Sequence, residues 1–382
     1  MGKKVVLLLQ GGGALGAFQF GAWRALERFL REEEHELIAV AGASIGAVNA
    51  ALIARHLHDE EGATPALERF WSRDAPNPPL PFIPFPGEYW RAWNGLLTGL
   101  LTGNPALFRP LYQYWTPVGD MLRFWMPLYD VGRSKQTLSA AFGRYRGNAP
   151  LLAVAATDVQ SGEAVLFDSA QTHVTPTMLA ASTAIPVLFS PVEIGGRYFW
   201  DGEIRSESLL PHVLARLHTT LPARDTLQDL LVIVVDMFNA RAGGLPSSTI
   251  SAQYRMLNII LGGKLAFDLE IFKVRNAYVD AVTRLHAAAR EHETPPALMQ
   301  QIEADYRRLL DERIGHIDVV RISRAQFEYE HISRDFDYSP QYLERLTEQG
   351  EARATEELRE YREGGMQQRP LAKVTPIRSR RQ

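Results

Sequence analysis

The chain has 382 residues, of which 46% are hydrophobic and 22% are charged, and its formal net charge is −3 at pH 7. This length and apolar content suit a soluble enzyme with a large core in one or two domains, and the slightly negative charge argues against nucleic-acid binding. The chain has no cysteine, which excludes disulfides, thiolate catalysis and cysteine-ligated metals.

The N-terminus predicts no targeting segment. The apolar run after Met1 is short and merges into a glycine loop, so cleaving it as a signal peptide would destroy that motif. No stretch has the length of a membrane span. We therefore expect a cytoplasmic protein, which can also lie peripherally at a membrane.

A glycine-rich loop follows the first predicted strand, residues 4–9. The loop contains Gly11, Gly12, Gly13 and Ala14, and the residues after it have the apolar spacing of a helix. Consecutive glycines at the start of a helix expose several backbone N–H groups on one side, where the helix dipole favours negative charge. Such a loop can bind a phosphate or the oxyanion of an acyl-transfer intermediate.

The phosphate alternatives fit less well. The spacing Gly11-x-Gly13-x-x-Gly16 matches the dinucleotide fingerprint, but that fold needs an acidic residue at the end of the second strand, where this chain has small residues. A P-loop needs a lysine that the loop lacks. A third interpretation, in which the loop has no ligand and only packs the strand against the helix, fits the same residues.

The second predicted strand, residues 37–40, leads into the sequence Gly42-Ala43-Ser44-Ile45-Gly46. This is the spacing of a nucleophile elbow, in which glycines allow a turn tight enough to present the serine hydroxyl. The elbow predicts attack of Ser44 on an acyl group. Other turns of small residues between a strand and a helix can mimic this spacing.

Residues 76–130 differ from their surroundings. Prolines interrupt regular structure there, and most of the tryptophans of the chain lie between Trp71 and residue 130. Because Trp and Tyr favour the boundary between membrane and water, we expect an apolar lid over the active site that admits acyl chains or contacts lipid. An insertion packed on the core, or a subunit interface, fits the same residues.

The middle of the chain predicts alternating strands and helices. We expect a hairpin from strands 151–157 and 163–167, helices at 175–183 and 209–217, and a buried strand at 230–236. Alternation of this kind, with an early elbow, predicts a three-layer α/β/α fold.

Asp201 ends an aromatic strand and precedes Gly202, so its carboxylate is expected beside a tight turn. Asp158 and Asp236 also end predicted strands and are rival candidates for a catalytic base, although neither is followed by glycine.

Together, the glycine loop, the elbow and the Asp-Gly turn resemble the patatin-like lipid acyl hydrolases, over residues 5–240. The resemblance implies a patatin-like α/β fold and a Ser44–Asp201 dyad. Asp201 would accept the serine proton and later activate water. The N–H groups of Gly12 and Gly13, together with Gly11 or Ala14, would hold the oxyanion. The dyad requires no cofactor and no metal.

The chain departs from the family pattern at three places. Leu15 stands where the family often has a basic residue, Glu203 replaces a small residue after the Asp-Gly, and residues 205–208 lack the usual Asn-x-Pro. These departures put in doubt the packing around Asp201 and the recognition of phosphate by a basic residue.

A dyad rather than a triad is expected because only one strand precedes the elbow, whereas an α/β-hydrolase has several. His173 and His212 are the histidines nearest the site in sequence, and we expect both at the surface or at a helix end.

We divide the chain into a patatin-like catalytic domain at 1–240, a mainly helical C-terminal extension at 241–366, and a basic, disordered tail at 367–382. Within the extension, residues 250–289, 297–312 and the last helix before Gly365 are expected to be helical, and residues 316–322 alternate like a strand.

The predicted function is a serine acyl hydrolase for lipid or other apolar esters. An esterase for small or oligomeric hydroxyacid esters is the enzymatic alternative. A catalytically silent membrane-binding or scaffold protein is the non-enzymatic one. The sequence gives no indication of the oligomeric state.

Overall fold

The computed structural model describes residues 2–81, 86–104, 106–111, 128–132, 135–137, 139, 149–204, 209–220, 228–238, 245–246, 248–262 and 264–364. The strands are β1 (Lys4–Leu9), β2 (Glu36–Ala43), β3 (Arg109–Pro110), β4 (Tyr129–Asp130), β5 (Leu151–Asp158), β6 (Ala164–Asp168), β7 (Val192–Ile194), β8 (Arg197–Asp201), β9 (Gln228–Asp236) and β10 (Ile314–Ser323). The α-helices are α1 (Gly16–Glu32), α2 (Ile45–His56), α3 (Thr64–Arg69), α4 (Glu88–Thr102), α6 (Pro176–Ser182), α7 (Leu210–Thr220), α8 (Thr249–Gly262), α9 (Lys264–Glu291), α10 (Pro296–Asp311), α11 (Glu330–Ser333) and α12 (Pro340–Gly364). Short helical turns are η1 (Gly13–Leu15), η2 (Phe70–Asp74), η4 (Gly202–Ile204) and η5 (Arg334–Phe336).

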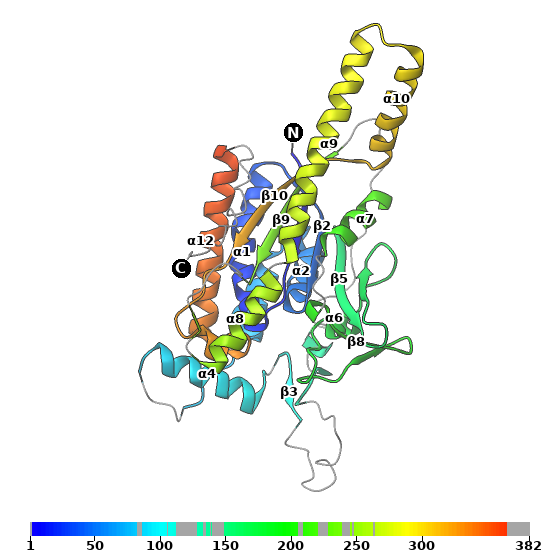
Figure 1. Cartoon of the computed structure of the whole chain (residues 1–382). Helices are drawn as coiled ribbons and strands as arrows, with labels where there is room; N and C mark the ends of the chain where they lie inside the picture. Colours follow the sequence, from blue (N-terminus) through cyan, green and yellow to red (C-terminus); the bar gives the residue numbers. More distant parts are fainter. Residues whose placement is uncertain are drawn as a thin grey trace, which may run out of the picture.

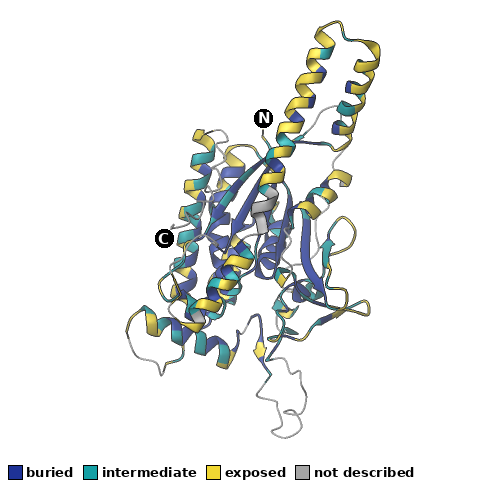
Figure 2. Ribbon diagram, viewed as in Figure 1, coloured by how far each residue is buried: buried dark blue, intermediate teal, exposed yellow. Residues whose placement is uncertain are grey.

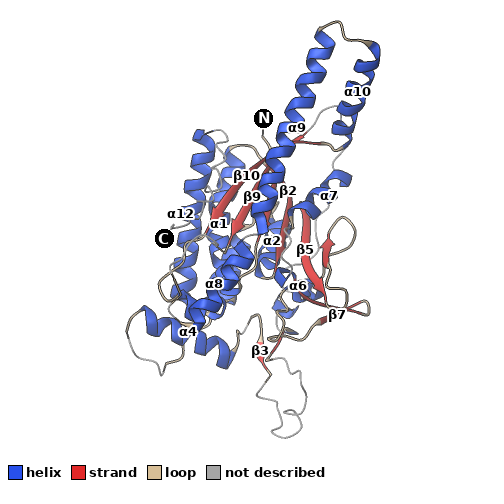
Figure 3. Cartoon of the chain, viewed as in Figure 1, coloured by secondary structure: helices blue, strands red, loops and turns tan. Residues whose placement is uncertain are grey.

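A central sheet organises the molecule, with the strand order β10-β9-β1-β2-β5-β8-β7 and β6 paired with β5 (Figure 3). The strands from β10 to β5 are parallel, whereas β6, β8 and β7 pair antiparallel to their neighbours. The carboxyl ends of β1 and β2 therefore open at the same edge of the sheet, where loops of α/β proteins commonly bind ligands.

Alternating side chains of the buried strands enter two separate cores. In β1, Val5, Leu7 and Leu9 pack into the core that contains α1, α2 and α12. Val6 and Leu8 point the opposite way, into a core with residues of α7 and α9. Figure 2 shows these strands buried between helices on both faces. The sheet and its two helical layers confirm the predicted α/β/α fold.

Helix α12 packs directly on α1, although more than 300 positions separate them in sequence. A Cβ atom placed on Gly21 would collide with the carbonyl oxygen of Thr347, and one placed on Gly350 would collide with that of Phe18. Two glycines facing each other's helix let the backbones approach closely. Strand β10 likewise extends the central sheet beside β9. Residues beyond 240 thus belong to the same core as the N-terminal elements.

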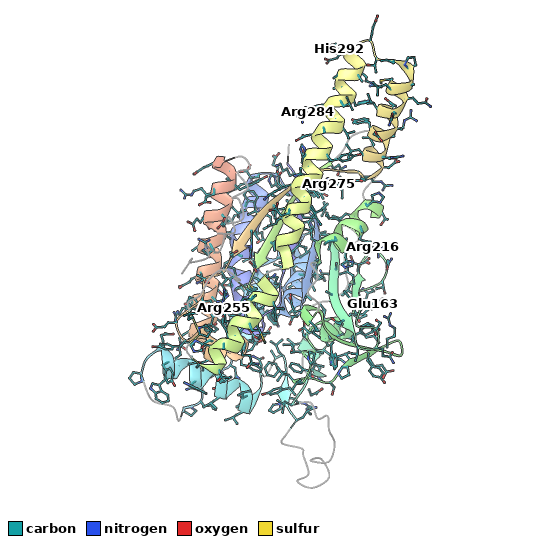
Figure 4. All side chains as sticks on the ribbon, in the orientation of Figure 1. Glu163, Arg216, Arg255, Arg275, Arg284 and His292 are labelled. Atoms are coloured by element: carbon teal, nitrogen blue, oxygen red, sulfur yellow. The ribbon has the colours of Figure 1, made fainter. Side chains whose placement is uncertain are left out.

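Helices α9 and α10 form a hairpin that projects from one end of the molecule (Figure 1). At its base, the Arg275 guanidinium donates to the carbonyl oxygens of Ile314 (2.6 Å) and Gly315, which ties α9 to the start of β10 (Figure 4). Arg284 lies farther out along the same helix, and His292 directly follows its last residue.

The described residues of the aromatic-rich segment at 76–130 pack against later parts of the chain. A Cβ on Gly99 of α4 would lie 2.6 Å from the carbonyl oxygen of Phe336, so α4 rests on η5. The Arg91 guanidinium also pairs with the carboxylate of Asp337, which is fully buried. Rings from the segment and from later parts of the chain pack together, with centroids 5.1–6.4 Å apart in the cluster of Phe108, Tyr129, Phe189, Phe336 and Tyr338. The four contacts of Phe108 are edge to face, and the two other contacts of Tyr129 are tilted.

The predicted hairpin, the helices near residues 175 and 209, the buried strand before Asp236 and the strand near residue 316 are all present. Thr175 caps α6 by accepting from the Met178 N–H (3.3 Å), and Pro176 follows it at the first helical position. The basic tail at 367–382, parts of the segment at 76–130 and residues 205–208 lie outside the described residues. None of the described helices combines the length and the apolarity needed to cross a bilayer.

Gly21 offers a direct test of the α1–α12 contact. Replacing it with valine should destabilise the protein by about 2 kcal/mol or more, because overpacking a close helix contact forces the backbones apart. Urea unfolding followed by circular dichroism measures the change. Gly364→Ala is the control, since a Cβ there meets no atom within 4 Å. Equal stability of Gly21→Val and wild type would contradict the assigned packing.

Candidate active site

The glycine loop and the elbow lie side by side because their strands are paired. Leu9 at the end of β1 is in register with Gly42 of β2. A Cβ atom on Gly46 would collide with the carbonyl oxygens of Leu9 and Gln10, and one on Gly42 would collide with the backbone of Gly46. Only glycine at these two positions lets α2 begin directly against the loop, which explains the elbow spacing.

Ser44 occupies the turn between β2 and α2 with φ 54° and ψ −132°. A positive φ at a non-glycine residue is strained, and such strain is typical of functional turns. The Ser44 N–H donates to both the carbonyl oxygen (3.1 Å) and the Oγ (3.0 Å) of Ser182 at the end of α6. Ser182 therefore holds the backbone of the elbow in its strained conformation.

The strand that ends at Asp201 and the strand that precedes Ser44 pair with the same edge of β5. Strand β6 covers the other edge of β5 from Ala153 to Thr157. Strand β2 pairs with β5 up to Ala155. Strand β8 pairs with β5 from Ala156 onward, and its last residue, Asp201, is in register with Ala156. The end of β2, followed by Ser44, and the end of β8 are thus consecutive along the same edge.

The segment after α6 contacts both residues. Besides the Ser182 bonds to Ser44, the Ala184 carbonyl accepts from the Asp201 N–H (2.9 Å). The Thr157 hydroxyl donates to the Asp201 carbonyl (3.0 Å). A Cβ on Gly202 would lie 2.5 Å from the Ala155 carbonyl oxygen, so the Asp-Gly turn needs glycine to approach β5. Asp201 and Ser44 are only 2% and 5% exposed.

Two consecutive glycines of the loop have a positive φ, which side chains rarely adopt. Gly12 and Gly13 have φ values of 146° and 54°, and the Leu15 N–H closes the turn onto the Gly12 carbonyl (3.0 Å). Within the described part of the chain, the N–H groups of Gly12 and Gly13 make no hydrogen bond. These two amides are therefore not engaged by any described residue.

A buried polar network behind the loop was not recognised from sequence. The Asn49 amide nitrogen donates to the Gly16 carbonyl (3.0 Å) and to the Gln19 Oε1 (2.8 Å), and Asn49 Oδ1 accepts from the Trp71 indole (2.9 Å). The Gln19 amide in turn donates to the Gln10 carbonyl (2.5 Å). Asn49 and Gln19 are each 1% exposed, so these bonds fix the loop against α1 and α2. The sequence did contain an indication of this network, because Gln19 in α1 and Asn49 in α2 are polar residues on the apolar face of their helix.

Glu203 is also brought into the site. Its N–H donates to Asp201 Oδ1 (2.8 Å), and its Oε1 accepts from the Gly11 N–H (2.7 Å). Of the three loop glycines, Gly11 therefore has its amide engaged by a carboxylate. The other side of the loop is covered by η5, since a Cβ on Gly13 would lie 2.6 Å from the Asp335 carbonyl oxygen.

The rival acids have other partners. Asp158 accepts from Arg197 Nε (2.7 Å) and from the N–H groups of Gln160 and Ser161, and Asp236 pairs with Arg321. The Ser161 N–H, with Arg197, holds the pKa of Asp158 below its usual value, which makes it a poor base. His173 and His212 are exposed, as expected.

Comparisons with known proteins give a family match. A family model described as patatin-like phospholipase matches residues 7–213, which include the glycine loop, Ser44 and Asp201. No curated protein matches the chain. Among solved structures, the chain is similar to the crystal structure of VipD from Legionella pneumophila, with a TM-score of 0.36 and 13% identity over 94% of this chain and 67% of that one.

The low pKa of Asp158 predicts a pH-dependent role in stability. A carboxylate whose folded pKa is depressed stabilises the fold above its unfolded pKa of about 3.9, and this is lost as the pH falls through the folded value. Asp158→Asn should therefore be less stable than wild type at pH 7, with a difference that shrinks as the pH falls below about 4. Urea unfolding at several pH values measures this difference, with Asp305→Asn as control, because the Asp305 side chain is 44% exposed. A difference that grows on acidification would contradict the assignment.

Proposed function

This chain belongs to the patatin-like phospholipase family, and on that premise we propose that it is a serine acyl hydrolase that cleaves carboxylic ester bonds of lipids through a Ser44–Asp201 dyad. One observation carries the proposal. The strained elbow of Ser44 and the buried carboxylate of Asp201 are consecutive along one edge of β5, beside a glycine loop with two amides that make no hydrogen bond among the described residues.

In the proposed reaction, Ser44 Oγ attacks the carbonyl carbon of the ester while Asp201 accepts the hydroxyl proton. The carbonyl oxygen becomes an oxyanion and receives hydrogen bonds from the N–H groups of Gly12 and Gly13. Collapse of the intermediate breaks the bond to the alcohol, which leaves with the proton from Asp201. Water then attacks the acyl-enzyme, again giving its proton to Asp201, and Ser44 regains a proton as the carboxylic acid leaves.

The burial of Asp201 supports its role as base. A buried carboxylate has lost most of its hydration, and the Glu203 N–H on Oδ1 orients the group. The exposed position of His173 and His212 supports a dyad rather than a triad.

Exposed apolar side chains support a lipid substrate and peripheral contact with a membrane. On α4, Trp90 and Leu101 are 40% and 48% exposed, and they share one face of the helix because eleven residues make about three turns. On α8, Met256, Ile259 and Ile260 are half exposed. Figure 1 shows α4 and α8 at the same end of the molecule as α6 and β8, which flank the site. An aromatic and aliphatic surface there would present the site to lipid.

A fluorophosphonate probe tests the dyad. Wild type should be labelled at Ser44, and Ser44→Ala should not be labelled at all. Asp201→Asn should be labelled at least about 100-fold more slowly, since a general base typically contributes 10²–10⁴ in rate. Asp158→Asn, the matched carboxylate control, should keep nearly the wild-type rate. Failure of the folded wild type to label, or equal loss in both Asp variants, would refute the proposed dyad.

Activity on vesicles tests the lipid-facing surface. The double variant Trp90→Ser, Leu101→Ser should hydrolyse p-nitrophenyl butyrate like wild type but should lose about tenfold or more on phospholipid vesicles, because interfacial aromatic and aliphatic side chains are removed. Tyr278→Ser on the projecting α9 is the control, since Tyr278 is similarly exposed (48%) at the opposite end. Equal losses on both substrates would contradict a role of this surface in contact with lipid.

A further inference from the structure

The carboxylate of Glu203 occupies a donor of the glycine loop. Glu203 Oε1 accepts from the Gly11 N–H at 2.7 Å, across 192 positions of sequence. A carboxylate on a backbone N–H is a charge-assisted bond, stronger than one between neutral groups. The loop that is suited to hold the oxyanion of the reaction therefore already holds an anion of the chain.

This carboxylate is close to the nucleophile. A Cβ atom built on Gly11 would lie 2.6 Å from Glu203 Cγ and 2.7 Å from Ser44 Cβ. The side chains of Glu203 and Ser44 therefore both lie against the same side of Gly11. The backbone of Glu203 is held in turn, because its N–H donates to Asp201 Oδ1 at 2.8 Å.

The negative charge of Glu203 opposes any other anion that enters the glycine loop. The oxyanion of the tetrahedral intermediate and the carboxylate of the released acid are both negative, and both would lie at the loop beside Ser44. A fixed negative charge beside Ser44 disfavours any second anion in a site from which water is partly excluded. A neutral ester carbonyl, which carries no net charge before attack, is disfavoured less.

We propose that Glu203 is a specificity-determining residue that keeps carboxylate anions, including the acid product, out of the oxyanion loop, and that it slows formation of the oxyanion as a consequence. This inference rests on the proposed function, because it assigns the loop to the oxyanion. Glu203 stays on the Gly11 N–H, beside the Gly12 and Gly13 amides that receive the substrate carbonyl, and its charge disfavours the acid product there. Glu203 is not itself a proton donor or acceptor in the reaction.

The first measurement is the rate of fluorophosphonate labelling. Glu203→Gln keeps the shape of the side chain and can still accept from Gly11, but it removes the charge. Labelling of Glu203→Gln should be about tenfold faster than that of wild type, because one adverse charge no longer opposes the developing oxyanion. Glu203→Ala should show the same direction. Glu193→Gln, an exposed neutralisation on β7, should label at the wild-type rate.

The second measurement does not depend on turnover. Calorimetric binding of decanoate, a carboxylate with an acyl chain, is compared between Ser44→Ala and the double variant Ser44→Ala, Glu203→Gln. We expect decanoate to bind at least about fivefold more tightly when Glu203 is neutral, since the competing anion is gone.

The outcomes separate the two proposals. Slower or unchanged labelling of both Glu203 variants, with decanoate affinity unchanged, would overturn the role of Glu203 and would assign it to holding the loop. Tighter decanoate binding in a protein that never reacts with the probe would support Glu203 while refuting the hydrolase. If Glu203→Gln does not fold, as judged by circular dichroism, the Glu203→Ala pair decides the same comparison.

Discussion

The site depends on the close approach of three backbone segments at the carboxyl ends of β1 and β2. Gly46 lies against the carbonyls of Leu9 and Gln10, and Gly42 lies against the backbone of Gly46. No side chain can separate these segments, so α2 begins at a fixed distance from the glycine loop. Because Ser44 is in that turn, the same contact sets both the strain of Ser44 and its distance from the loop amides.

Elements distant in sequence hold this arrangement in place. Ser182 and Ala184, at the end of α6, bond to the backbones of Ser44 and Asp201 and keep the two chain segments together. Two elements from the C-terminal region also contribute. The turn η5 lies against Gly13 of the loop, and α12 packs on α1, the helix that follows the loop. The C-terminal region is therefore part of the structure that supports the site.

Charge at the site is distributed unevenly around the loop. The buried network of Asn49, Gln19 and Trp71 satisfies the polar groups behind it with neutral partners. In front of it, the only carboxylate bond to the loop among the described residues comes from Glu203, which replaces a small residue of the family pattern.

The sequence alone determined the local chemistry. Glycine spacing, strand periodicity and the Asp-Gly turn are properties of neighbouring residues, so the elbow, the loop, the hairpin and the three-layer fold could be predicted without coordinates. What the tertiary structure decided were pairings across long stretches of chain. The order of β2 and β8 along β5 placed the strand end at Asp201 next to the strand end before Ser44, and the bond from Gly11 to Glu203 joined residues 192 positions apart. Such contacts follow from packing and register, which no local pattern encodes.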